Sequence, residues 1–126
     1  MNPQTVHRIK HFLEFFFRIP NEKWATNQLN RGERSCALGH LGVLNESHLN
    51  KEGLELCELL YPVARSHGYV THNNCYDSGC VTTINDTDSA VRPEPRDRIL
   101  WALNERLQME VQYEITGTDT SDQTLP

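Results

Sequence analysis

The sequence has little positive charge and no long apolar run. Of its 126 residues, 12 are lysine or arginine and 17 are aspartate or glutamate, which gives a formal net charge of -5 and a pI near 5.6. Nucleic acids and membrane surfaces are anionic, so this balance argues against direct nucleic-acid binding and against membrane-surface binding. The sequence contains no run of about 18 apolar residues, the length that a helix needs to span a bilayer. The N-terminal residues lack the apolar core of a signal peptide. We therefore expect a cytoplasmic protein.

Cysteine is also scarce, and the common catalytic and nucleotide-binding motifs are missing. Four cysteines are too few for a disulfide scaffold at this length. The glycine-containing stretch at 39–42 lacks the lysine and the preceding strand of a phosphate-binding loop, and no G-x-S-x-G or H-E-x-x-H sequence occurs. The sequence therefore gives no basis for a nucleotide or any other cofactor.

Amphipathic helical patterning is what the chain does contain. Apolar residues recur at three- and four-residue intervals over about 3–18, 36–45, 51–67 and 95–107. Pro62 lies inside the third segment and must kink or split it, because the proline ring clashes with a carbonyl one turn back. We expect these four helices to pack around one core. Its predicted members are Ile9, Leu13, Phe16, Leu38, Leu41, Leu56, Leu60, Ile84, Leu100 and Leu103.

The helix ends carry their own signals. Asn2 and Asn50 are suitable N-caps, because an asparagine side chain can accept a hydrogen bond from a free amide of the first turn. Ser35 is predicted to cap the second helix in the same way. Pro20 should stop the first helix, and Gly68 supplies a left-handed stop for the third.

Two short runs rich in β-branched residues, 69–72 and 81–84, predict strands that form a small hairpin. The segment 109–115 alternates apolar and polar residues, which suits a strand, yet it also continues the apolar stripe of the preceding helix. Both interpretations stay open, with the longer helix favoured. The predicted fold class is α+β: one mainly helical domain over residues 1–116, with about four helices and a hairpin, and a disordered tail over 117–126.

The most suggestive site begins at Cys36, which this pattern places in the first turn of the second helix. The positive end of a helix dipole favours the thiolate form of a cysteine. His72 follows on one predicted strand, and Asn85 and Asp86 end the next. A cysteine hydrolase needs a thiolate to attack, an imidazole to move the proton and a third group to orient the ring. This order predicts Cys36 as nucleophile, His72 as base and Asp86 or Asn85 as orienting group.

A structural interpretation of the same residues stays open. Cys36 suits a place where a helix packs closely, His72 suits a strand surface, and Asp86 is a common turn residue. His40 is a rival partner for Cys36, because position i+4 lies on the same helix face. Trp24 is the only large side chain in the loop over 21–33, where it either anchors the loop to the core or forms the wall of a binding cleft.

A metal site over His67, His72, Cys75 and Cys80 is the remaining alternative. These four residues are zinc-type ligands, but structural zinc sites use tighter pairs, two to four residues apart. The intervening turn needs no ion to close. We therefore predict no metal.

The order of these features resembles a family of small uncharacterised proteins of phages and their bacterial hosts. The resemblance consists of the tryptophan loop at Trp24, a Cys-Ala-Leu-Gly helix start at 36–39, an Asn-Asp strand end at 85–86 and a closing helix. The sequence departs from that pattern in having Ile84 in place of an aromatic residue and an inserted turn over 73–79. The resemblance implies an origin in a bacterial host cell and a topology, but no activity.

Two functions of different classes follow. The first is a small cysteine-dependent hydrolase or acyl transferase that uses Cys36, His72 and Asp86. The second is a noncatalytic binding or inhibitor protein of a mobile element, which blocks a host factor through an acidic face or through a pocket near Trp24, with His40 and Asn85 as further binding residues. The partner is an unidentified small molecule or a host protein in either case.

Overall fold

The computed structural model describes residues 2–45, 48–69, 79–87 and 91–116. This part of the chain is mainly helical and includes a small antiparallel two-stranded sheet, which confirms the predicted α+β class. The elements, in chain order, are α1 (Pro3–Phe17), the 3-10 turn η1 (Asn21–Lys23), β1 (Asn30–Arg31), β2 (Arg34–Ser35), α2 (Ala37–His40), α3 (Lys51–Ser66), α4 (Gly79–Asp86) and α5 (Pro95–Thr116).

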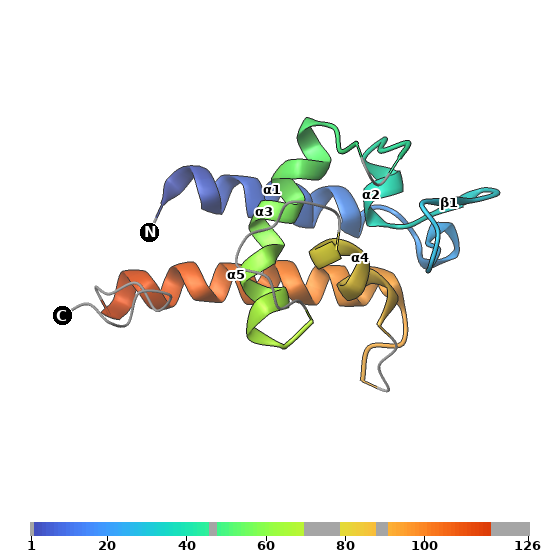
Figure 1. The fold of residues 1–126 in the computed structure, drawn as a ribbon. Helices are drawn as coiled ribbons and strands as arrows, with labels where there is room; N and C mark the ends of the chain where they lie inside the picture. Colours follow the sequence, from blue (N-terminus) through green and yellow to red (C-terminus); the bar gives the residue numbers. More distant parts are fainter. Residues whose placement is uncertain (1, 46–47, 70–78, 88–90, 117–126) are drawn as a thin grey trace.

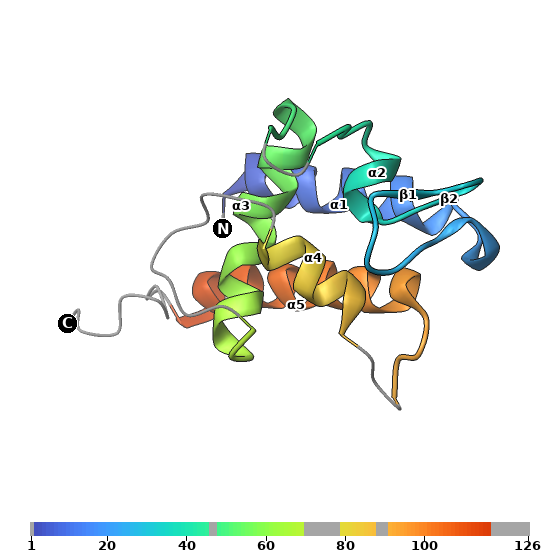
Figure 2. The same ribbon diagram turned by 45° about the vertical axis from the view of Figure 1, so that its right-hand side comes forward.

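The two long helices α1 and α5 lie side by side and run in opposite directions, and α3 crosses them (Figure 1). The short helix α4 packs between α3 and α5, as the turned view in Figure 2 shows. Helix α2 and the β1-β2 hairpin lie together at the end of the molecule where α5 begins. All five helices contribute side chains to one core.

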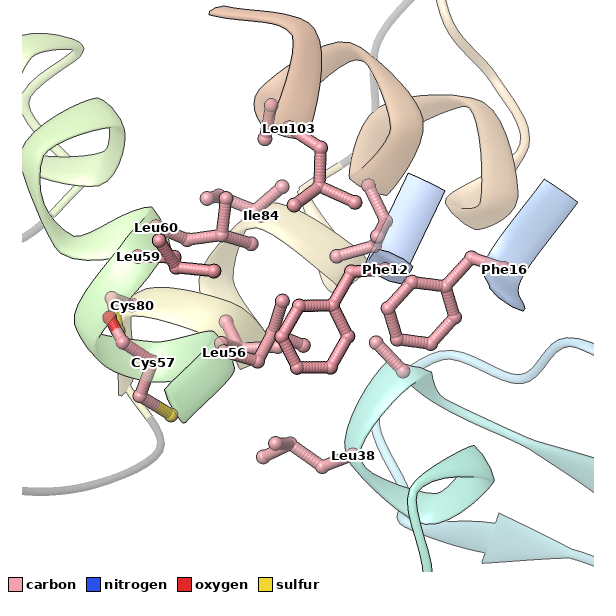
Figure 3. Packing of buried hydrophobic residues seen from close by; sticks show 14 of the residues in the cluster. Phe12, Phe16, Leu38, Leu56, Cys57, Leu59, Leu60, Cys80, Ile84 and Leu103 are labelled. Carbon is pink, nitrogen blue, oxygen red and sulfur yellow. The ribbon is translucent and has the colours of Figure 1, made fainter. Parts of the chain in front are cut away.

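Aromatic and aliphatic side chains from these helices meet in a single buried cluster (Figure 3). Phe12 and Phe16 from α1 pack there with Leu38, Leu56 and Leu103. Most of the core predicted from the sequence is confirmed. The exceptions are Leu13 and Leu100, which are only partly buried.

Several helix ends are confirmed at atomic level. Asn2 Oδ1 accepts hydrogen bonds from the amides of Gln4 and Thr5 at the start of α1. Asn50 Oδ1 accepts one from Gly53 N at 2.8 Å. Gly68 has φ +74° directly after α3, the left-handed conformation expected of a stop.

Pro62 does not split its helix, because α3 runs from Lys51 to Ser66 without a break. The segment 109–115 is helical as well and forms the C-terminal part of α5. The open alternative of a strand there is therefore wrong. The apolar stripe that it shares with the preceding helix was the decisive signal.

The predicted strand at 81–84 is wrong, since these residues belong to helix α4. Their β-branched composition favoured a strand, but Cys80, Val81 and Ile84 are buried together on one face of a helix. Spacings of three and four residues suit that face, and packing overrides intrinsic β propensity in so short a run. Most of the partner strand, 70–72, lies outside the described residues.

The second helix is much shorter than predicted. It covers Ala37–His40 and ends before Gly42, whose φ of +87° leaves the helical region. Ser35 belongs to strand β2, and Cys36 is itself the N-cap, with an extended backbone. The prediction of Ser35 as cap, with Cys36 inside the first turn, is therefore wrong.

The hairpin of this fold lies earlier in the chain, at residues 30–35. Arg31 pairs with Arg34 and Asn30 with Ser35 across the ladder. Gly32, with φ +67°, occupies the first position of the two-residue turn, where a type II′ turn requires a positive φ.

Candidate functional site

A polar cleft of about 700 Å³ lies at the hairpin end of the molecule. One wall is the loop after η1 together with the hairpin, and the opposite wall is the end of α4 and the start of α5. Its size is typical of pockets that bind small molecules. The residues lining it are Asn21, Trp24, Ala25, Thr26, Asn27, Arg31, Arg34, Asp86, Pro93, Glu94, Pro95 and Arg98.

Trp24 fixes the loop that forms the first wall. Its side chain is 2% exposed, and its indole Nε1 donates a hydrogen bond to the carbonyl of Ile19 at 3.1 Å. The ring lies 5.5 Å from that of Phe16 and 4.9 Å from that of His40, measured between centroids. Trp24 therefore anchors the loop to the core and also lines the cleft.

Asn85 joins both walls through its fully buried side chain. Its Oδ1 accepts a hydrogen bond from Ala37 N at 3.1 Å, and its Nδ2 donates to the carbonyl of Ala25 at 2.9 Å. The same Nδ2 lies 2.7 Å from Asp86 Oδ1 and so orients a carboxylate that lines the cleft. Asn85 thus holds the loop, the start of α2 and the end of α4 in fixed relation.

Arg98 organises the opposite wall and was not among the site residues predicted from the sequence. Its guanidinium group donates to the carbonyl of Asn85 through Nε at 3.1 Å and Nη2 at 2.7 Å, and through Nη1 to the carbonyls of Arg92 and Pro93. The side chain is buried, at 4% exposure. A cation at a helix C-terminus is favourable, and here it lies at the end of α4. Arg98 stands in the first turn of α5, where the helix dipole disfavours a cation, and this was the sequence feature that could have indicated a special role.

Cys36 is brought close to Asn85 but not into the cleft. The amide of the next residue, Ala37, is the one that Asn85 Oδ1 binds. Cys36 is 3% exposed and is absent from the described residues that line the cleft. Its backbone N–H donates to Leu29 O at 3.0 Å, which ties the hairpin to the start of α2. His72 lies outside the described residues, and Asp86 ends a helix, not a strand.

His40 packs against Trp24 on the core side of the loop. Burial lowers the pKa of its imidazole from the ordinary value of 6.5, while backbone groups of Lys23 and Ser35 raise that pKa by a smaller amount. Its Nε2 is buried and has no hydrogen-bond partner among the described residues. The uncharged ring is therefore the form that this site favours.

The suggested metal ligands divide between described and undescribed parts of the chain. Cys80 is fully buried, with Sγ donating to the carbonyl of Cys57 at 3.2 Å. His67 Nε2 lies 3.3 Å from Glu105 Oε1, and its ring packs against Trp101. His72 and Cys75 lie outside the described residues. Among the residues that the structure does describe, no group of three or more His, Cys, Asp or Glu side chains could hold a metal ion.

The site thus consists of a preformed polar cleft whose two walls are joined by the buried Asn85, and whose wall at the end of α4 and the start of α5 is held by the buried Arg98. Comparison of the chain with protein-family models, curated proteins and solved structures found no match. The resemblance to small phage proteins therefore stays a prediction. Within the described ranges, no helix is both long enough and apolar enough to cross a membrane.

Proposed function

We propose that this protein is a noncatalytic binding protein whose recognition site is the cleft beside Trp24. The observation that carries the proposal is the cleft itself: about 700 Å³, polar, and bounded by the loop that Trp24 and Asn85 fix in place. A site held rigid before binding loses little conformational entropy when a ligand enters. This rigidity supports recognition as the role of the cleft.

Burial of the candidate nucleophile supports binding over catalysis. A reactive cysteine is normally partly exposed in an electropositive environment, whereas Cys36 is 3% exposed. The described residues that line the cleft include neither a cysteine nor a histidine. A ligand in the cleft would therefore meet hydrogen-bonding and charged groups, and no thiol-imidazole pair.

The bound component belongs, on this proposal, to a bacterial host cell, as the resemblance to phage proteins implies. The net charge of -5 makes an acidic face the other candidate surface for such a partner. The cleft is preferred because a buried hydrogen bond of Asn85 joins its two walls and the buried Arg98 fixes one of them, whereas a solvated acidic face has no such construction.

A retention experiment with four proteins tests the proposal. Immobilised wild type, Cys36→Ser, Thr26→Trp and Gln28→Trp are incubated with bacterial lysate, and retained proteins and small molecules are identified by mass spectrometry. Thr26 lines the cleft, and an indole there fills it, whereas Gln28 is an exposed residue of the same loop outside the cleft lining. Circular dichroism checks that each variant is folded.

We expect wild type, Cys36→Ser and Gln28→Trp to retain the same component and Thr26→Trp to lose it. Equal retention by Thr26→Trp, or no component retained by wild type, would contradict the proposal. Loss in Cys36→Ser alone would favour chemistry at the thiol.

A cysteine hydrolase is the second candidate function, with Cys36, His72 and Asp86 in the roles given above. One observation favours it: the hydrogen bond from Ala37 N to Asn85 Oδ1 brings the Asn85-Asp86 pair next to Cys36. If Cys36 is the nucleophile, it alkylates with an apparent pKa well below the free-thiol value of about 8.5. Iodoacetamide labelling against pH, with Cys36→Ala as blank, measures this. Slow labelling limited by unfolding would reject it.

A further inference from the structure

The two arginines of the hairpin are placed directly opposite each other. Arg31 on β1 is the register partner of Arg34 on β2. Side chains in such a pair have Cβ atoms about 4.5–5.5 Å apart on the same face, and like charges in this position destabilise the sheet. Both residues line the cleft. The hairpin therefore places two like charges beside each other at one cavity, at a cost to its own stability.

The neighbouring cross-strand pair shows the opposite chemistry. Ser35 Oγ donates a hydrogen bond to Asn30 Oδ1 at 2.6 Å on the other face of the ladder. One face of the hairpin is thus complementary, and the cleft face is repulsive. Among the described residues, no carboxylate forms an ion pair with Arg31 or Arg34.

The hairpin is nevertheless held firmly. Ala25 N donates to Ser35 O at 3.0 Å, and Cys36 N donates to Leu29 O at the same distance. Beneath the hairpin, Gly39 permits close approach, because a Cβ there would overlap Leu29 O. The strands that carry both arginines therefore stay in place, although the guanidinium groups themselves are exposed.

We propose that Arg31 and Arg34 form a clamp for an oxyanion, and that the cleft takes a small polar molecule carrying a carboxylate or phosphate group. Guanidinium groups bind such oxyanions through paired, charge-assisted hydrogen bonds. A bound oxyanion removes the repulsion between the two side chains. The opposite wall carries Asp86 and Glu94, which accept hydrogen bonds. The ligand therefore has hydroxyl or amino donors at the end away from its oxyanion.

This inference rests on the proposed function, because it names the group that the cleft recognises. Its test is a thermal-unfolding titration with potassium phosphate, with succinate and with glycerol, at ionic strength held constant with potassium chloride. The proteins are wild type, Arg31→Gln, Arg34→Gln, the double variant and Arg18→Gln. Arg18 is an exposed arginine at the C-cap of α1, outside the cleft lining, so its variant controls for loss of one positive charge.

Phosphate, succinate or both should raise the midpoint of wild type in a saturable manner, while glycerol should not. The anion that acts identifies the source of the oxyanion. Each single variant should bind it roughly tenfold more weakly or worse, the double variant should not respond, and Arg18→Gln should behave as wild type. Without anion, the hairpin variants should unfold at the wild-type temperature or above it, because a like-charge contact is removed.

An equal anion response in the double variant would mean an adventitious ion only and would overturn the clamp. A lower midpoint of the single variants without anion would assign these arginines a structural role and would overturn it too. In the retention experiment, a double variant that still retains the component lost by Thr26→Trp would reject the clamp while keeping the cleft. If the double arginine variant and Thr26→Trp both retain the component, the proposal that the cleft is the recognition site would be rejected.

Discussion

Asn85 Oδ1 accepts a hydrogen bond from the backbone amide of Ala37 across 48 residues of sequence, at 3.1 Å. This bond occupies an N–H group at the start of α2, next to Cys36, that would otherwise be available to a thiolate or a substrate oxygen. The same side chain holds the carbonyl of Ala25. Asn85 therefore has a structural role: it connects the end of α4 to the start of α2 and to the loop wall of the cleft.

Replacing Asn85 by alanine should lower the free energy of unfolding by about 2–4 kcal/mol, because the Ala37 amide and the Ala25 carbonyl both lose their buried partner. Urea denaturation followed by circular dichroism measures this. Asn104→Ala is the matched control, since Asn104 is exposed and, among the described residues, bonds to Leu100 O of its own helix. A loss equal to that of the control would contradict the role assigned to Asn85.

Arg98→Lys should also destabilise the protein by about 2–4 kcal/mol. A lysine keeps the charge, but it cannot reproduce the fork that reaches the carbonyls of Asn85, Arg92 and Pro93 together. Hydrogen exchange at residues 91–94 should speed up in the variant, because this segment loses its anchor. Arg8→Lys, at an exposed arginine on α1, should change neither quantity. Unchanged exchange in Arg98→Lys would refute the anchoring role.

Gly39→Ala should displace the hairpin or prevent folding. The new Cβ would overlap Leu29 O and lie 2.9 Å from Ser35 Cβ, and both atoms belong to the hairpin region packed on α2. Gly32→Ala is the contrasting control, since nothing lies within 4 Å of its Cβ and only its φ of +67° is unfavourable. That control should cost about 1 kcal/mol. Equal stability of the two variants, measured by thermal unfolding, would show that the close approach is not needed.

Stability should fall as the pH drops below 6.5, and His40 should contribute to that fall. Burial lowers the pKa of this imidazole in the folded state, so the unfolded chain binds a proton more readily. The contribution is fully present above the unfolded pKa and is lost as the pH falls through the folded pKa. His40→Gln should unfold with a smaller difference between pH 7 and pH 5 than wild type.

Trp24 reports the same titration, because its ring contacts that of His40. In a Trp101→Phe background, which leaves Trp24 as the sole tryptophan, its fluorescence should change over this pH range when His40 is present and not in His40→Gln. His7→Gln, at an exposed position on α1, is the control and should titrate as wild type does. A pH dependence of His40→Gln identical to that of wild type would exclude His40 as its source.

The fold class and the ends of the long helices α1 and α3 could be predicted because they depend on local chemistry. Asn50 caps α3, and Gly68 ends it through side-chain and backbone properties that need no distant contact. The three- and four-residue spacing of apolar side chains also placed most of the core, since a helix buries one face wherever it packs. These features depend on residues that are close together in the sequence.

The short elements could not be predicted in the same way. Val81 and Ile84 are good strand residues, and their helix α4 is selected by burial against α3 and α5. The second helix stops after four residues because Gly42 turns the chain, and the hairpin forms earlier, where Asn30 meets Ser35. In runs of four to eight residues, tertiary packing contributes more than local preference.

The candidate site divides along the same line. From the sequence, Trp24 is expected either to anchor its loop or to form the wall of a cleft, and the Asn85-Asp86 pair is a hypothetical partner of Cys36 at the end of a predicted strand. The structure shows that Trp24 both anchors the loop and lines the cleft, and that the pair ends helix α4. Only the tertiary structure decided that Cys36 is buried, that Arg98 joins the end of α4 to α5, and that Arg31 faces Arg34 across a ladder. Burial, long-range hydrogen bonds and strand register arise when distant segments pack, and none of them has a local sequence signature.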